Sequence, residues 1–175
     1  MEREIIDFSP LDRGTIIHEV LREYYYNYKN EIEDHVLGKG VFSIEDTYDY
    51  IVDRIEFNMK SMGLETETKL WKLRIESNAN NILNLIRADL DRMSKYKEKV
   101  LPLHFEIDFG RSRPFFIEID GHKIPLRGKI DRIDKYVDSD KYIIIDYKNT
   151  GYGIKEIEDM ESGLSLQLPV YIMSQ

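Results

Sequence analysis

Apolar residues recur at helical spacing through the first hundred positions of the chain. They fall every three or four residues in three stretches, which are residues 17–28, 44–62 and 75–93. Because one helical turn takes 3.6 residues, each stretch predicts an amphipathic helix with one buried face. Ser43, followed three positions later by Asp46, predicts a capping box at the start of the second helix.

The period changes to two after Pro102. Apolar and polar residues alternate over residues 103–109, 115–119 and 123–133, and residues 141–148 form a further stretch that is dense in isoleucine. Alternation of this kind predicts strands, and the sequence Asp120-Gly121 predicts a hairpin turn between two of them. We therefore expect an α/β protein, in which helices flank a mixed central sheet from about residue 101 to residue 148.

A chain of 175 residues, of which 42% are hydrophobic, predicts one domain over residues 1–175. Residues 43–96 read as a helical insertion within it. A helical pattern resumes at Ser162 and continues without a cap to the last residue, so we expect a piece of a longer chain. With no signal peptide and no apolar run near the ~20 residues of a membrane span, we expect a cytoplasmic protein that does not contact a membrane.

The charge of the chain limits how it could bind a polyanion. A formal net charge of −8 argues against broad coating of nucleic acid. Residues 111–135 nevertheless hold seven Lys/Arg and four Asp/Glu, so the remainder carries −11. The sequence has no cysteine, which excludes disulfides, thiolate zinc sites and iron–sulfur clusters within it. A bound metal would take oxygen and imidazole nitrogen ligands.

Two carboxylates and a lysine predict a metal site on the sheet. Asp146 and Lys148 would project from one face of the isoleucine-rich strand, about 7 Å apart, on a strand that we expect to be central and buried. Asp131 would lie beside Asp146 if the two strands are neighbours. Adjacent carboxylates favour a cation between them, and Mg²⁺ prefers oxygen ligands. Gly128, upstream of Asp131, indicates a close approach of backbone or ligand. The alternative to a metal site is that Asp146 and Lys148 are ordinary solvated charges on the protein surface.

Four short motifs carry a family resemblance. Residues 14–18 read Gly-Thr-Ile-Ile-His, residues 128–134 read Gly-Lys-Ile-Asp-Arg-Ile-Asp, residues 146–148 read Asp-Tyr-Lys, and residues 167–171 read Gln-Leu-Pro-Val-Tyr. In this order they resemble the Gly-x-x-x-His, Gly-x-x-Asp-Arg-Ile-Asp, Asp-Tyr-Lys and Gln-x-x-x-Tyr motifs of RecB-family nucleases in the PD-(D/E)XK superfamily. The long helical stretch is similar to nuclease domains of the AddB type. Together the motifs span nearly the whole chain.

The resemblance implies a restriction-endonuclease-like fold and a metal-dependent deoxyribonuclease of the exonuclease type. Its implied partners are DNA and a helicase, either a separate subunit or a domain of the parent protein, in a DNA repair system. The implied ligands of Mg²⁺ or Mn²⁺ are His18, Asp131, Asp146 and the backbone carbonyl of Tyr147. Lys148 would be the catalytic lysine, acting with both aspartates. Gln167 and Tyr171 would contact DNA or order the site. An iron–sulfur cluster, frequent in AddB-type nucleases, could exist only in the parent protein.

Several assignments stay open at this level. His18 also fits a histidine at the edge of a helical core. Glu106 could be a further acidic ligand or a buried ion-pair partner. Arg132 and Asp134 point away from Asp131 on a regular strand, so a salt bridge within the fold is expected for them. Two other functions are consistent with the same sequence: a catalytically silent nuclease-like module that binds DNA or scaffolds a partner, and a structure-selective endonuclease.

Overall fold

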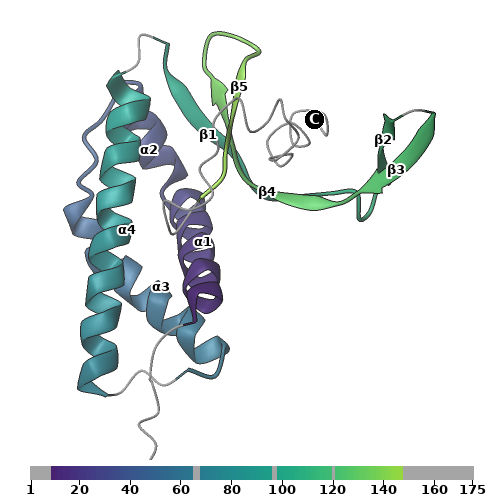
Figure 1. Ribbon diagram of the computed structural model, residues 1–175. Helices are drawn as coiled ribbons and strands as arrows, with labels where there is room; N and C mark the ends of the chain where they lie inside the picture. Colours follow the sequence, from purple (N-terminus) through teal and green to yellow (C-terminus); the bar gives the residue numbers. More distant parts are fainter. Residues whose placement is uncertain (1–8, 65–67, 96–97, 120, 148–175) are drawn as a thin grey trace, which may run out of the picture. The chain divides into compact units, whose positions relative to one another are not determined.

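The computed structural model describes residues 9–64, 68–95, 98–119 and 121–147 (Figure 1). Contacts divide the chain between Lys99 and Val100 into two units, which we call the helical unit and the strand unit. Among the described residues, helices make up the first unit and strands the second, which confirms the predicted α/β class. Within the part of the chain that the structure describes, no helix is both long and apolar enough to cross a membrane.

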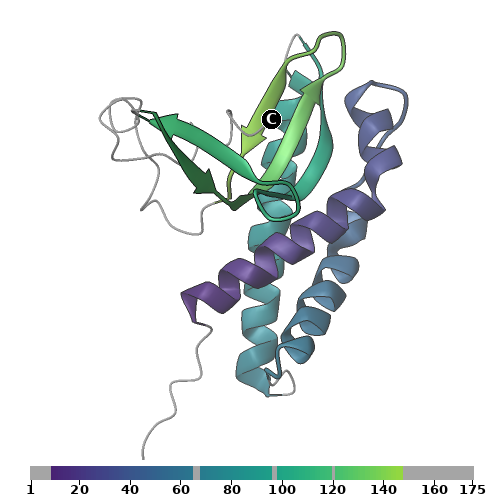
Figure 2. The same cartoon turned by 90° about the vertical axis from the view of Figure 1, so that its right-hand side faces the viewer.

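Four α-helices and one 3-10 turn make up the described part of the helical unit. They are α1 (Pro10–Asn27), α2 (Lys29–Val36), η1 (Glu45–Thr47), α3 (Tyr48–Ser61) and α4 (Lys69–Lys95). Helix α3 packs against both α4 and α1, and α2 packs against α4 (Figure 1, Figure 2). The predicted apolar stripes form the core, because their buried members are Val20, Leu21, Tyr24, Tyr25, Ile51, Ile55, Met59, Ile75, Ala79, Ile82, Ile86, Leu90 and Met93.

The capping box predicted at Ser43 is wrong. A 3-10 turn precedes α3 instead, and Ile44 takes its N-cap position without a side-chain hydrogen bond. Thr47 is buried there and donates to the Ile44 carbonyl at 2.6 Å, while its oxygen lies 3.0 Å from the hydroxyl of Tyr24. Burial raises the pKa of Tyr24 to about 12, so its hydroxyl remains a proton donor to Thr47.

Five strands form two antiparallel sheets in the described part of the strand unit. The strands are β1 (Val100–Phe109), β2 (Phe115–Ile119), β3 (His122–Leu126), β4 (Gly128–Tyr136) and β5 (Tyr142–Ile145). Three of them form a sheet in the order β1-β4-β5, and β2 and β3 form a separate hairpin. Gly121 has φ 75 at the hairpin turn, which agrees with the turn predicted from sequence.

Two glycines shape the base of the hairpin and divide the single strand predicted over residues 123–133. A Cβ on Gly128 would lie 2.5 Å from Cζ of Phe109, directly across the sheet. Gly110 has φ 74, and a Cβ there would lie 1.9 Å from the carbonyl oxygen of Leu126. A group does approach Gly128 closely, but it is the side-chain ring of Phe109 and not the backbone or ligand that the sequence led us to expect.

The central strand of the described sheet is β4. The isoleucine-rich strand β5 was expected to be central and largely buried, but among the described strands it pairs with β4 alone and is half-buried. Strand β4 takes both neighbours, and its residues from Ile130 to Asp134 are all buried. All described pairings are antiparallel, so the mixed character predicted for the sheet is not seen in this part of it.

Candidate metal centre

Two carboxylates face each other across strands β1 and β4. The register pairs Phe105 with Arg132 and Ile107 with Ile130, which places Glu106 opposite Asp131. A carboxylate oxygen of Glu106 and one of Asp131 lie within 4.8 Å of each other. Two anionic groups this close repel unless a cation lies between them, and oxygen-only ligands suit Mg²⁺ or Mn²⁺. The donor chemistry of this pair therefore fits the metal that the sequence predicts.

Glu106 adopts an unusual backbone conformation in the middle of β1. Its φ is 53, a value that an L-residue with a long side chain rarely takes, and it follows a shift in strand register between Pro102 and His104. The Glu106 side chain is only 8% exposed and forms an ion pair with Lys129. The ion pair was one of two roles left open for Glu106, and the structure shows it with a partly exposed lysine as the partner, whereas metal ligation by Glu106 stays a prediction.

Asp131 is held in place by the chain that follows β5. Strand β4 pairs with β5, with Arg132 opposite Ile145, so Asp131 and Asp146 stand at the next position of the same ladder. The backbone N–H of Tyr147 donates to Oδ2 of Asp131 at 2.7 Å. The predicted adjacency of the two strands is confirmed. Asp146 is not a member of the group of ligand atoms that contains Glu106 and Asp131, so the sharing of one cation by Asp131 and Asp146 stays a prediction.

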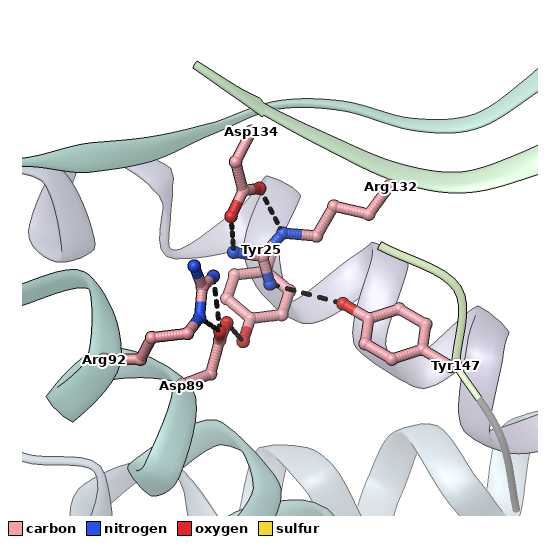
Figure 3. A network of polar contacts seen from close by, with 6 residues as sticks. All are labelled: Tyr25, Asp89, Arg92, Arg132, Asp134 and Tyr147. Atoms are coloured by element: carbon pink, nitrogen blue, oxygen red, sulfur yellow. Dashed lines mark hydrogen bonds and ion pairs between the residues drawn. The ribbon is translucent and has the colours of Figure 1, made fainter. Parts of the chain in front are cut away.

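Arg132 and Asp134 form a fully buried ion pair on β4 (Figure 3). Nε of Arg132 donates to Oδ1 of Asp134 at 2.5 Å, and Nη2 donates to Oδ2 at 2.8 Å. Its guanidinium carbon also lies 5.8 Å from the ring centre of Phe105, its cross-strand neighbour. The salt bridge predicted from sequence is confirmed. Its two parallel hydrogen bonds fix the guanidinium plane.

Tyr147 connects both sides of β4. Its hydroxyl accepts a hydrogen bond from Nη1 of Arg132 at 3.2 Å, while its backbone N–H donates to the neighbouring Asp131 (Figure 3). Arg132 and Asp131 are consecutive strand residues and project to opposite faces of β4. Tyr147 therefore binds to both faces of β4 and holds the segment after β5 against it. Sequence reasoning assigned Tyr147 only a backbone carbonyl and missed the role of its hydroxyl. The buried Arg132, whose third nitrogen needs an acceptor, was the available signal.

A second polar network lies within the helical unit. Asp89 on α4 accepts a 2.5 Å hydrogen bond from the hydroxyl of Tyr25 on α1, and Arg92 donates to the same carboxylate at 2.8 and 3.0 Å (Figure 3). These bonds join two helices that are distant in sequence. The hydrogen bond to Asp89 gives the hydroxyl of the buried Tyr25 a partner, so this network has a structural role.

The remaining predicted site residues are not tested by the structure. His18 lies half-buried on α1, one turn after Gly14. Lys148, Gln167 and Tyr171 lie outside the described residues. Their assigned roles stay predictions.

Comparison with known proteins gives the same family as the motifs. The profile of the PD-(D/E)XK nuclease superfamily matches residues 2–174. Three similar proteins are each named as a subunit of an ATP-dependent helicase/deoxyribonuclease. They come from Clostridium novyi (32% identical over 183 residues), Acetivibrio thermocellus (31% over 180) and Ruminiclostridium cellulolyticum (30% over 182).

Each alignment covers 98% of this chain, and the chain spans 15% of the length of these relatives. The family profile covers both units, including both opposed carboxylates and all four motifs. The chain belongs to the PD-(D/E)XK nuclease superfamily.

Proposed function

We propose that this chain is a metal-dependent deoxyribonuclease that hydrolyses phosphodiester bonds from DNA ends. The observation that carries the proposal is the opposed pair of Glu106 and Asp131, whose carboxylate oxygens lie within 4.8 Å of each other in a member of a nuclease superfamily. Two carboxylates side by side are unfavourable unless positive charge offsets them, and a bound cation would add to the charge that Lys129 already supplies to Glu106. The names of the similar proteins, which combine helicase and deoxyribonuclease, support DNA as the substrate.

Oxygen ligands from Asp131 and Glu106 would hold Mg²⁺ or Mn²⁺. By their motifs, Asp146, the carbonyl of Tyr147 and His18 complete the proposed ligand set. When bound, such a cation lowers the pKa of a coordinated water and offsets negative charge on the attacked phosphate.

The chain's own residues have separate roles in this proposal. The Tyr147 N–H orients the Asp131 carboxylate by donating a hydrogen bond to its Oδ2. Arg132 and Asp134 keep Tyr147 in position. Lys148 would stabilise charge on the phosphate as it is attacked. Gln167 and Tyr171 would contact the DNA strand or order the motif strands.

The proposed partner is a helicase that delivers DNA strands during repair. This part rests on the printed names of the relatives, of which the chain spans 15%. The partner could be a separate protein or another segment of the same parent protein. An iron–sulfur cluster could be held only by the parent, because this sequence has no cysteine.

A cleavage assay tests the proposal. Linear single-stranded and duplex DNA are incubated with the chain in Mg²⁺, in Mn²⁺ and in a chelator, and the products are sized. We expect cleavage only with metal, and a loss of about 10²–10³ in rate for Asp131→Asn and for Lys148→Gln. Asp138→Asn is the matched control, because Asp138 is exposed in the turn after β4. Cleavage that persists in the chelator or in Asp131→Asn would contradict the proposal.

The same assay separates the two other functions. A chain that binds DNA but leaves every substrate intact would be a silent binding or scaffold module. Nicks confined to a branch point would indicate a structure-selective endonuclease, whereas release of nucleotides or short oligomers from ends indicates an exonuclease. Equal cleavage of closed circular and linear DNA would contradict the end-dependent part of the proposal.

A further inference from the structure

Positive side chains follow one face of the strand unit, starting beside the carboxylate pair. Lys129 is two residues before Asp131 on β4, and its ammonium pairs with Glu106, so all three side chains share that face. Asp108 lies opposite Lys129 in the register. Nε of Arg111 lies 3.4 Å from Oδ1 of Asp108, which places Arg111 at the end of the same face.

The base of the β2–β3 hairpin brings a further arginine to this position. A Cβ on Gly110 would lie 2.8 Å from Cα of Arg127, so the chain segments that carry Arg111 and Arg127 cross in direct contact. Arg127 is exposed, and the side chains of Arg111 and Lys129 are 69% and 44% exposed. We call Lys129, Arg111 and Arg127 the cation track. Figure 1 shows the hairpin extending from the ends of β1 and β4, the strands that carry the carboxylates.

We propose that the cation track binds the phosphate backbone of the DNA strand whose bond lies at the carboxylate pair. This inference rests on the proposed function and adds the surface that holds the substrate. Charge complementarity supports it: residues 111–129 hold five Lys/Arg and two Asp/Glu in a chain whose net charge is −8. Exposed arginine and lysine contact phosphates without reading the bases, so the contact is independent of sequence.

The spacing of the track matches a nucleic-acid strand. Lys129 stands about 7 Å along β4 from Asp131, from the rise per residue of a strand. Arg127 lies beyond it, between the end of β3 and the start of β4. One strand of B-form DNA presents a phosphate roughly every 3.4 Å along the helix axis. For a DNA helix whose axis runs parallel to β4, Lys129 would face a phosphate roughly two nucleotides from the bond at Asp131. The track would hold a short stretch of product or substrate next to the site.

DNA binding measured in a chelator tests the track apart from metal binding and cleavage. Fluorescence anisotropy of a labelled oligonucleotide gives the dissociation constant of the 175-residue chain over a series of low salt concentrations. The test variant replaces Arg111, Arg127 and Lys129 with Gln. Its control, equal in charge, replaces Lys60, Lys72 and Arg87 with Gln on the helical unit. Circular dichroism checks that both are folded.

We expect the DNA affinity of the test variant to be about ten-fold or more lower. The magnitude of its slope of log K against log salt should fall by about three, roughly one for each phosphate contact removed. The control variant should change the affinity by less than about two-fold. Equal losses in both variants would show an effect of net charge alone and would overturn the proposal. So would an unchanged affinity, or no measurable binding by the unsubstituted chain at the lowest salt.

Two further measurements keep the outcome interpretable. If the triple variant does not fold, Arg127→Gln replaces it, with an expected loss of about one in the salt slope. Calorimetry with Mn²⁺ on the same proteins reports on the carboxylate pair. Suppose that the track variant loses DNA affinity but that no protein in the series, the unsubstituted chain included, binds Mn²⁺. This result would refute the nuclease proposal and would leave the DNA-binding surface supported.

Discussion

The helical unit and the strand unit bury different kinds of side chain. In the described part of the helical unit the buried residues are apolar, with Thr47 as the exception. In the strand unit, Asp131, Arg132 and Asp134 are buried at 8%, 0% and 0% exposure, next to an apolar cluster whose buried members are Ile130 and Ile133. Burial of charge is unfavourable unless each group is paired or used. The contrast is one of apolar burial in the helical unit and of buried charge, with the carboxylate pair, in the strand unit.

Neighbouring residues of strand β4 also differ in how their buried charges are compensated. Arg132 and Asp134 satisfy each other through two hydrogen bonds, so their burial is explained within the fold. Asp131 accepts a hydrogen bond from the Tyr147 N–H and faces the Glu106 carboxylate, and this carboxylate pair is the one for which we propose a bound cation. Four substitutions test this division, in order of decreasing effect.

The largest effect is expected from breaking the buried ion pair. Arg132→Ala would leave Asp134 charged and buried without its partner, at a cost of about 3–5 kcal/mol in the free energy of unfolding. The double variant Arg132→Met with Asp134→Leu removes both charges and should recover most of that loss. Urea denaturation measures both. A single variant as stable as the unsubstituted chain would show that the pair does not matter for stability.

Truncation in the helical core should cost slightly less. Ile55 is fully buried on α3, so Ile55→Ala should destabilise the chain by about 2–4 kcal/mol through lost contacts and a residual cavity. At a temperature where the variant is folded, its affinity for Mn²⁺ should be unchanged, because Ile55 is not among the proposed ligands. An altered metal affinity would contradict the separation of stability from chemistry.

Filling the space at Gly128 should have an intermediate effect. The added methyl group of Gly128→Ala would overlap the ring of Phe109, and we expect a loss of about 1–3 kcal/mol. Combining Gly128→Ala with Phe109→Leu makes room for the methyl group. Thermal melts should then show that the glycine substitution costs less in the Phe109→Leu background than in the unsubstituted chain, and equal costs would exclude the ring as the cause.

The smallest effect is expected at the Tyr147 hydroxyl. Tyr147→Phe removes one acceptor from Arg132, which should cost about 1 kcal/mol in stability. The proposed positioning role adds a second readout, a several-fold weaker affinity for Mn²⁺, since outer-shell partners of ligands commonly change metal affinity by about ten-fold or more. Stability that falls while metal affinity stays constant would limit the hydroxyl to a structural role.

Much of this arrangement could be predicted from periodicity alone. The helical stripes around Tyr24, Ile55 and Ile86 follow local spacing, and each is buried as expected. The Arg132–Asp134 salt bridge is also local, because two residues on one strand share a face. The four motifs, taken together and in their order, were sufficient to assign the family.

Features that depend on strand register could not be predicted from the periodicity of the sequence. Glu106 faces Asp131 only because of the register that follows the shift between Pro102 and His104, and local alternation carries no record of such a shift. The pairing of β5 with β4 alone among the described strands likewise depends on contacts between segments distant in the sequence. The hydroxyl of Tyr147 finds Arg132 fifteen residues away, across a turn that the sequence pattern does not place.

Calorimetric titration of the chain with Mn²⁺ most directly tests the claim that Glu106 and Asp131 form a metal site. The variants are Glu106→Gln and Asp131→Asn, with the exposed Asp138→Asn as control. The account predicts one bound ion, an affinity reduced by about ten-fold or more in both variants, and no change in the control. Equal affinity in all four proteins, or no binding by the unsubstituted chain, would contradict it.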